Sequence, residues 1–200
     1  MDIILSIDVG TTGIKVGLVD TSGTVIISAG YEYRIVAPQP GFAEQDPDVW
    51  WQGFVDCCSR LRQSYRREFE QIVGVGICGQ MHTHVYLDQH SRIVRPAITW
   101  MDQRSIDVVN EINRDPVKKQ QVFRETQNIA TTTYTAPQLQ WVQQNQPEIW
   151  SQVSHVLIAK DFIKYRLTNI MVTDYSDASG TLLFNSIEKT WSQTIFFRYC

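Results

Sequence analysis

The chain has 200 residues, 43% of them hydrophobic and 20% charged, and its formal net charge is −3. This length can enclose a hydrophobic core, and this composition excludes a disordered chain. The charge gives no reason to expect nucleic acid as a partner, and no apolar run reaches the roughly 18 residues of a membrane span. With no basic leader and no C-x-x-C pair among its four cysteines, we expect a globular cytoplasmic protein without a membrane partner.

The first thirty residues predict three antiparallel strands joined by tight turns. Residues 3–8 and 14–20 are apolar runs on either side of the turn at 10–13. A third run, 24–29, follows the turn signal at 21–23. Apolar runs bounded by glycine-rich turns are typical of a strand meander.

A helix is predicted to begin at Asp46-Pro47. Asp46 can accept hydrogen bonds from free N–H groups, and Pro47 suits the first helical position. Residues at helical spacing predict its apolar face: Trp51, Phe54, Val55, Cys58, Leu61 and Tyr65. The basic residues of this stretch are interpreted as a solvated helix face: Arg60, Arg62, Arg66 and Arg67.

Further along, short strands alternate with helices. Strands are predicted at Gln71–Cys78, which is interpreted as buried, and at Val85–Asp88, Ala97–Trp100 and His155–Ile158. Helices are predicted from Gln103 to about Asn145, with interruptions at Pro116 and Pro137, and over Asp161–Leu167. The whole pattern predicts an α/β fold with a mixed sheet.

The N-terminal turn is the first candidate site. Gly10 lets an anion approach the backbone N–H groups, and Thr11 and Thr12 add hydroxyl donors. Asp8, at the strand end, can hold Mg²⁺, because this ion prefers oxygen ligands. Lys15 is expected on the second strand, in a phosphate-binding or a structural role. An ordinary glycine turn is the alternative.

Two polar segments at predicted strand ends are further candidates. Gln80 and His82 can hydrogen-bond sugar hydroxyls while Met81 packs on the carbon atoms, and a polar turn is the alternative. Trp100 can stack on a sugar face, and Asp102 can accept hydrogen bonds from hydroxyls. For this pair, the alternative is a core tryptophan followed by an aspartate helix cap.

Three other patterns are rejected. Gly74-x-Gly76-x-x-Gly79 has dinucleotide-binding spacing, but its glycines lie inside the predicted strand instead of after it. His82-x-His84 has no further metal ligand at a suitable spacing. The P-loop pattern does not occur.

Six segments, in this order along the chain, resemble the FGGY family of carbohydrate kinases, and within it the xylulokinases: Ile7–Lys15, Glu44–Trp51, Gly79–His82, Arg95–Arg104, Tyr134–Leu139 and Thr173–Thr181. The resemblance implies a transferase of carbohydrate metabolism with an actin-like, ribonuclease-H-like fold in two lobes. It also implies ATP and Mg²⁺ between the lobes, with Asp8 at the metal-phosphate end and Thr11 and Thr12 near the ATP phosphates.

The same resemblance bears on the sugar. It implies that Met81 and His82 contact the substrate, which favours a ketopentose such as D-xylulose. Glycerol kinases have an Arg-Glu pair there, so glycerol is disfavoured. Thr83-His84 departs from the glycine that usually follows the histidine, and Met101 stands where a small polar residue is usual. These departures leave another ketose or gluconate open.

The resemblance places the catalytic base in a glycine-rich segment downstream of Thr181, and the adenine pocket in a second lobe. Neither matches this chain, and Ile195–Cys200 departs from the family pattern. We therefore expect residues 1–200 to be an incomplete N-terminal, sugar-binding domain, from a truncation or a frameshift, that does not phosphorylate sugars alone. Asp174 and Asp177 are interpreted as capping or turn residues.

Two other classes stay open. One is a different actin-like ATPase, such as a chaperone or a filament protein, and the other is a non-catalytic sugar-binding remnant. The resemblance also implies a possible homodimer in the full-length family.

Overall fold

The computed structural model describes residues 2–195. Within these residues the chain forms two compact units, and each unit is built from three separate stretches. The first unit comprises residues up to 35, 46–80 and 159–170, and the second comprises 36–45, 81–158 and those from 171 onward. Because the stretches interleave, no linker marks the boundary in the sequence. None of the helices formed by residues 2–195 is long and apolar enough to cross a membrane.

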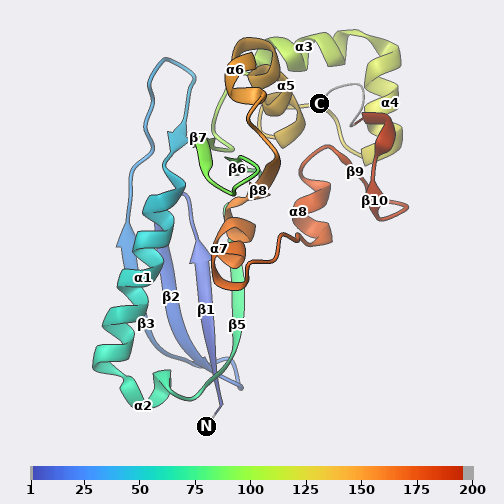
Figure 1. Ribbon diagram of the computed structural model, residues 1–200. Coiled ribbons are helices and arrows are strands. Elements are labelled where there is room, and N and C mark those ends of the chain that lie inside the picture. The colour runs from blue at the N-terminus through green and yellow to red at the C-terminus, as the bar shows by residue number, and fades with distance from the viewer. Residues whose placement is uncertain (1, 196–200) are drawn as a thin grey trace. The chain divides into compact units, whose positions relative to one another are not determined.

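The first unit contains a four-stranded mixed sheet with the order β3-β2-β1-β5 (Figure 1). Its strands are β1 (Ile3–Val9), β2 (Gly13–Asp20), β3 (Val25–Glu32) and β5 (Ile72–Gly79). β1, β2 and β3 pair antiparallel, whereas β5 runs parallel to β1. The predicted meander and the mixed sheet are confirmed.

Helices α1 (Pro47–Ser64) and α7 (Ala159–Thr168) pack on one face of this sheet, and the short α2 (Arg66–Phe69) follows α1 (Figure 1). Gly53 lets α1 come close, because a Cβ there would lie 2.8 Å from side-chain atoms of both Ile14 and Tyr31. Trp50 of α1 is fully buried and meets Phe162 of α7 edge-on, with ring centroids 6.3 Å apart.

The start of α1 is as predicted, but part of its predicted apolar face is wrong. The Asp46 carboxylate accepts a hydrogen bond from the Asp48 N–H at 3.0 Å, and Pro47 is the first helical residue. Trp50 and Cys57 are fully buried instead of Trp51 and Cys58, and Val55 is exposed. The sequence holds adjacent apolar pairs, and spacing alone cannot tell which member of a pair faces the sheet. The four predicted surface arginines are exposed.

The predicted burial of the strand now seen as β5 is also wrong. β5 pairs only with β1 and forms an edge of the sheet. Val73 is 65% exposed and Val75 is 53% exposed. A run of small apolar residues is typical of a buried strand, but burial depends on the position in the sheet, which only long-range pairing decides.

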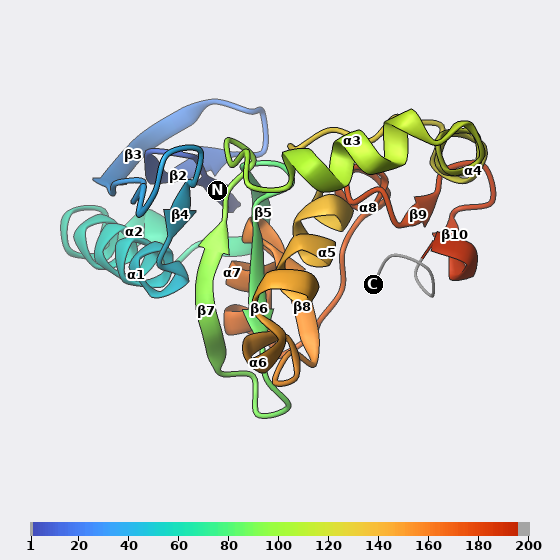
Figure 2. The ribbon, with the colours of Figure 1, turned by 90° about the horizontal axis from the view of Figure 1, so that it is seen from above.

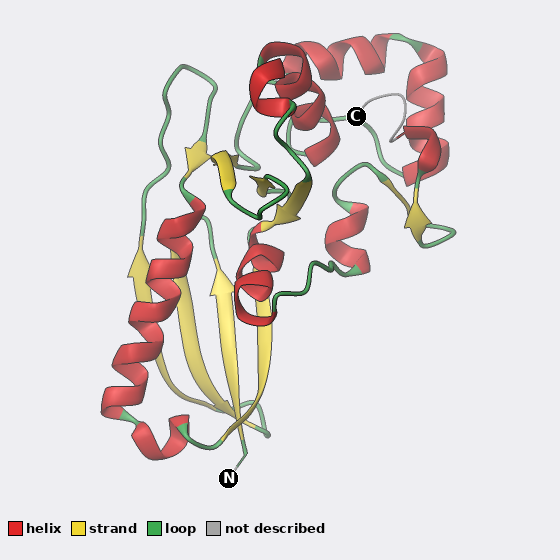
Figure 3. Cartoon of the chain, in the orientation of Figure 1, coloured by secondary structure: helices red, strands yellow, loops and turns green. Residues whose placement is uncertain are grey.

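The second unit contains an antiparallel sheet with the order β4-β7-β6-β8 (Figure 2). Its strands are β4 (Glu44–Gln45), β6 (His84–Leu87), β7 (Ile93–Ile98) and β8 (His155–Ile158). Its helices are α3 (Ile106–Arg114), α4 (Pro116–Thr126), α5 (Thr135–Asn145), α6 (Pro147–Trp150) and α8 (Tyr175–Ser179). A small hairpin follows, made of β9 (Phe184–Asn185) and β10 (Thr190–Trp191) (Figure 3). The core includes Tyr86, Ile98, Val109, Ile112, Leu139, Val142 and Leu182.

In this unit two sequence predictions are wrong and one is confirmed. β7 ends at Ile98, so Trp100 lies in a turn and not in a strand. Pro137 does not interrupt the helix, because it is the third residue of α5, where the N–H has no partner within the helix. The interpretation of Asp174 as a cap is confirmed, since it caps α8 by accepting from the Asp177 N–H at 2.9 Å.

Replacing Asp46 by alanine should lower the free energy of unfolding by about 1 kcal/mol, because the start of α1 loses its capping oxygen. Asparagine caps equally well, so Asp46→Asn should leave the stability nearly unchanged. Equilibrium urea denaturation followed by circular dichroism measures both variants. Equal stabilities for the two variants would contradict this role of Asp46.

Candidate functional site

In the first unit, the predicted metal and phosphate residues gather at one end of the sheet. Asp8 lies directly opposite Lys15 of β2 and beside Cys78 of β5. Directly paired residues project from the same face of a sheet, and all three residues are exposed. Lys15 therefore lies on the second strand, as predicted. The exposed Asp8 carboxylate is accessible to a cation.

The turn between β1 and β2 requires glycine at two positions. A Cβ on Gly10 would lie 2.9 Å from the Gly13 carbonyl oxygen, and a Cβ on Gly13 would lie 2.9 Å from the Tyr31 carbonyl oxygen. Thr11 and Thr12 lie between the two glycines, with Thr12 exposed at the tip. The turn is thus built from a backbone that approaches its neighbours closely.

Tyr33 orients this turn, and the sequence-based predictions did not include it. Its hydroxyl donates to the Gly10 carbonyl at 2.6 Å, and its N–H donates to the Thr12 carbonyl at 3.1 Å. Burial, assisted by the negative charge of Asp8, raises the pKa of Tyr33, so the hydroxyl stays a donor. Both carbonyl oxygens therefore accept hydrogen bonds from Tyr33. The alternation of Tyr31, near the end of β3, and Tyr33, just after it, is the one local signal for this role.

Gln80 belongs to a different unit from the two residues that follow it. It belongs to the first unit, is buried, and donates its N–H to the Val9 carbonyl at 2.7 Å. Met81 and His82 belong to the second unit. The sugar contact of Gln80 stays a prediction.

In the second unit, Met81, His82 and Thr83 form a γ-turn. The Thr83 N–H donates to the Met81 carbonyl at 2.7 Å, and His82 has a φ of 61°. A left-handed φ in such a turn is strained for a residue with a side chain, and strain of this kind persists only where the surroundings hold it. It is also a common mark of functional sites.

Two imidazoles hold the γ-turn. Nδ1 of His82 lies 2.9 Å from the Gly180 carbonyl, and Nδ1 of His84 lies 2.9 Å from the His82 carbonyl. A carbonyl oxygen only accepts, so both Nδ1 atoms carry the proton. The Thr135 hydroxyl also donates to the His82 carbonyl at 3.4 Å.

The remaining ring nitrogens then act as acceptors. Burial lowers the pKa of His82, and it lowers the pKa of His84 to about 4, so both rings are neutral near pH 7. In His84, Nε2 accepts the hydroxyl of Tyr86 at 2.7 Å. In His82, which is half-buried, Nε2 is an acceptor of the kind that a sugar hydroxyl needs.

Two apolar side chains are exposed on the loops around this turn. Met81 is 58% exposed and Trp100 is 38% exposed. The first residue of β6 and the last residue of β7 lie at the same end of the sheet, since His84 pairs with Ile98. The Trp100 N–H donates to the Thr83 hydroxyl oxygen at 3.1 Å. The structure therefore brings the backbone around Met81, His82 and Trp100 together.

Tyr134 is a further residue of this region that had no predicted role. Its ring meets that of His82 edge-on, with centroids 5.0 Å apart and an interplanar angle of 82°. The tyrosine stands at the start of one of the six segments quoted above, directly before α5. That position was the only signal for it in the sequence.

Asp102 lies in the same loop as Trp100 but is fully buried. Its Oδ2 accepts from the Ala43 N–H at 2.6 Å, and both of its oxygens accept from the Arg104 guanidinium at 2.8–2.9 Å. Arg104 also binds Glu44 and lies over the Phe42 ring. Asp102 is no helix cap, since Ser105 precedes α3. A sugar contact of Asp102 stays a prediction, and a hydroxyl would have to compete with these partners.

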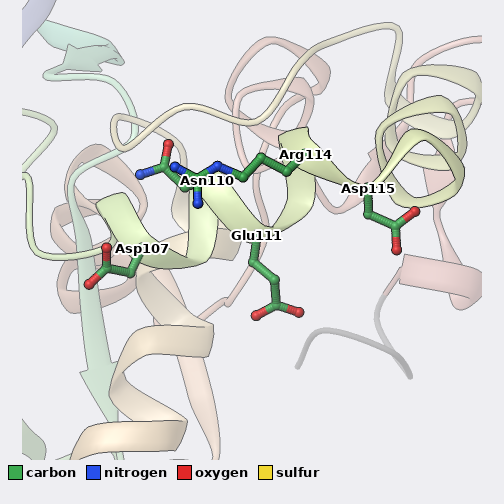
Figure 4. A pocket seen from close by; sticks show the side chains of 5 residues that line it. All are labelled: Asp107, Asn110, Glu111, Arg114 and Asp115. Carbon is green, nitrogen blue, oxygen red and sulfur yellow. The ribbon is translucent and has the colours of Figure 1, made fainter.

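A separate hollow lies along the outer side of α3 (Figure 4). Its lining residues are Asp107, Asn110, Glu111, Arg114 and Asp115. None of the predicted site residues is among them. Figure 4 shows Arg114 directed along the helix toward Asn110, with Glu111 and Asp115 on the other side. Within residues 2–195 no group of three or more His, Cys, Asp or Glu side chains is arranged to hold a metal ion.

Comparison with known proteins defines the class of this protein. Residues 3–198 match the N-terminal domain of the FGGY family of carbohydrate kinases. The chain belongs to this family. The match extends to residue 198, into the stretch Ile195–Cys200 where a departure from the family pattern was expected. That departure stays a prediction, and residues 196–200 lie outside the described residues.

Several individual relatives are xylulose kinases. The xylulose kinase of Lactococcus lactis subsp. lactis (strain IL1403) is 36% identical over 195 residues, which are 98% of this chain and 38% of the relative. A crystal structure of a xyloylose kinase from Brucella ovis matches with a TM-score of 0.93 and 34% identity, over 98% of this chain and 41% of that chain.

A gluconate kinase structure from Lactobacillus acidophilus matches almost as well. Its TM-score is 0.91 and its identity is 27%, over 98% of this chain and 39% of that chain. The likeness to these kinase structures confirms the actin-like fold and the N-terminal position of the chain in the family. The chain spans about 38% of the length of the Lactococcus relative.

Replacing Gly180 by alanine should disturb His82. The Gly180 backbone has φ −76° and ψ −3°, which suits alanine, but a Cβ would lie 2.5 Å from His82 Cε1 and 2.6 Å from Nδ1. We expect Gly180→Ala to lower the free energy of unfolding by about 1–3 kcal/mol. In a His82→Ala background the same change should cost almost nothing. Urea denaturation of the four proteins measures this coupling, and additive effects would rule it out.

The stability should depend on pH through His84. Burial first, and the positive charges of Arg95 and Arg104, lower its pKa from 6.5 to about 4. Between these values the unfolded chain binds the extra proton, so unfolding becomes easier as the pH falls. Across this window His84 should remove about 3 kcal/mol of stability.

The check is the free energy of unfolding between pH 7 and 4, compared between the wild-type chain and His84→Asn. Asparagine does not titrate, so the variant should show a flatter dependence, whatever its stability at pH 7. Parallel curves for the two proteins would exclude this role of His84.

Proposed function

We propose that this chain is the sugar-binding N-terminal domain of an ATP-dependent kinase that phosphorylates a ketopentose such as D-xylulose. One observation carries the proposal: Nδ1 of His82 is bound to the Gly180 carbonyl, which leaves Nε2 as the hydrogen-bond acceptor, and Met81 and Trp100 are exposed on adjoining backbone. Sugars offer hydroxyl groups and apolar C–H surface, and sites for them combine a few fixed polar groups with apolar contacts.

The residues of the first unit fit a role at the ATP phosphates. We assign the turn of Gly10, Thr11 and Thr12 to the phosphate oxygens, because Tyr33 holds the Gly10 and Thr12 carbonyls. The Gly10 N–H donates to the Gly13 carbonyl at 3.0 Å, so Gly10 contributes the space that lets an anion approach, and the two threonines contribute the donors. We assign Asp8 to Mg²⁺ and Lys15 to a phosphate or to Asp8 itself, since both side chains are exposed on one face. Bound Mg²⁺ would neutralise the charge that spreads over the transferring phosphoryl group.

The sugar itself is the finer part of the proposal. D-Xylulose is supported by the Met81-His82 pair and by the name of the Lactococcus relative. D-Gluconate is the second candidate, because one of the similar structures is a gluconate kinase. Met101, which is also exposed beside Trp100, is the departure from the xylulokinase pattern that can reach a bound sugar.

We further propose that the 200 residues alone bind sugar without turning it over. The family resemblance assigns the proton-accepting aspartate to a segment downstream of Thr181, and base catalysis contributes about 10²–10⁴-fold. The partner in our proposal is therefore a small-molecule sugar. A homodimer, a cytoplasmic location and the absence of a nucleic-acid partner stay predictions.

Sugar binding by the purified chain tests the proposal. Isothermal titration with D-xylulose, D-gluconate and glycerol should give the tightest binding for D-xylulose. His82→Ala should weaken it about tenfold, because a fixed acceptor is lost. His90→Ala, which changes an exposed histidine in a turn of the same unit, should have no effect and is the matched control.

The outcomes separate the candidates. Tighter binding of D-gluconate would favour the second sugar. Equal effects of the two histidine variants would remove His82 from the site. A coupled assay with ATP and Mg²⁺ should detect no sugar phosphate formed by the 200 residues, and turnover there would contradict the inactivity of the isolated chain.

A further inference from the structure

Thr83 follows the Met81-His82 pair, at a position where the family resemblance leads one to expect glycine. A larger residue there raises the question of whether its side chain enters the sugar site. The structure answers it, because Thr83 is fully buried and thus offers no surface to a ligand.

The contacts of Thr83 run in two directions. Its backbone N–H closes the γ-turn onto the Met81 carbonyl at 2.7 Å. Its side-chain oxygen accepts the backbone N–H of Trp100 at 3.1 Å. One residue thus ties the strained turn of His82 to the backbone of the exposed tryptophan, and a glycine could make only the first of these contacts.

The bond from Thr83 acts at Trp100 itself, whereas Asp102 and Gln103 of the same segment have other partners. The segment lies between the end of β7 at Ile98 and the start of α3 at Ile106, outside the regular ladder. On its other side the Thr99 N–H donates to the Ala43 carbonyl at 3.0 Å. Threonine suits position 83, because its branched Cβ restricts χ1 and therefore fixes the direction of the hydroxyl that accepts from Trp100.

We propose that Thr83 is a positioning residue that fixes Trp100 relative to His82, and thereby sets the shape of the sugar site. This proposal rests on the proposed function for its effect on sugar affinity. The link between Thr83 and Trp100 is a property of the protein without a ligand, so it can be tested separately.

Two variants isolate the hydroxyl. Thr83→Val keeps the shape of the side chain and removes the hydroxyl that accepts from Trp100. Thr83→Ser keeps this hydroxyl and removes a methyl group. In the chain without sugar, amide hydrogen exchange at Trp100, followed by nuclear magnetic resonance, should be about tenfold or more faster in Thr83→Val. Thr83→Ser should exchange close to the wild-type rate.

Sugar affinity provides the second measurement. Thr83→Val should weaken D-xylulose binding about tenfold, and Thr83→Ser should restore it to within about threefold of the wild type. Because Thr83 acts through Trp100, the valine change should have no further effect in a Trp100→Ala background. If Thr83→Val does not fold, Thr83→Ala and Thr83→Ser form a second pair that differs only by the hydroxyl.

The results decide between clear alternatives. Wild-type exchange at Trp100 in Thr83→Val overturns the proposal, as does faster exchange with unchanged sugar affinity. If the wild-type chain binds none of the sugars, the proposed function fails instead. The exchange rates then still decide whether Thr83 fixes Trp100.

Discussion

The second unit depends on one strained residue. His82 adopts a left-handed φ of 61° that its side chain disfavours, at a cost of order 1–3 kcal/mol. Hydrogen bonds to Gly180, from His84 and within the γ-turn closed by Thr83 hold it there. The two bonds made by imidazoles also specify a chemical state, because their carbonyl acceptors fix the proton on Nδ1 of His82 and of His84. The backbone conformation and the acceptor character of Nε2 therefore have one cause.

In the first unit the turn between β1 and β2 is also held by a residue from outside it, Tyr33. In the proposed phosphate site the carbonyl oxygens of the turn have to point away from the anion, since they repel what the N–H groups attract. Tyr33 holds the carbonyls of Gly10 and Thr12 with its hydroxyl and its own N–H. Burial keeps that hydroxyl protonated by raising its pKa. In both units, then, a buried partner from outside the motif orients the backbone of the motif, and the motif residues alone do not.

This division explains what could be predicted from the sequence. Local signals identified the meander and the Asp46 cap, because each depends on a few neighbouring residues. The burial of β5 could not be predicted, because it depends on which strands pair. The choice between Trp50 and Trp51 depends on the sheet beneath α1. The contacts of Tyr33 with Gly10, of Tyr134 with His82 and of Ala43 with Asp102 join distant parts of the chain, so only the fold reveals them.

Asp102 and Thr83 are buried polar residues whose oxygens bind other parts of the same unit. Asp102 uses its oxygens on Ala43 and Arg104, and Thr83 uses its hydroxyl on Trp100. Both are buried, so a change at either position acts on how firmly the loop is held. In the proposed sugar site the side chains open to a ligand are the exposed Met81 and Trp100, together with the half-buried His82. Under that proposal the departure from the family pattern at Thr83 bears on the rigidity of the site, whereas the exposed Met101 bears on which sugar fits.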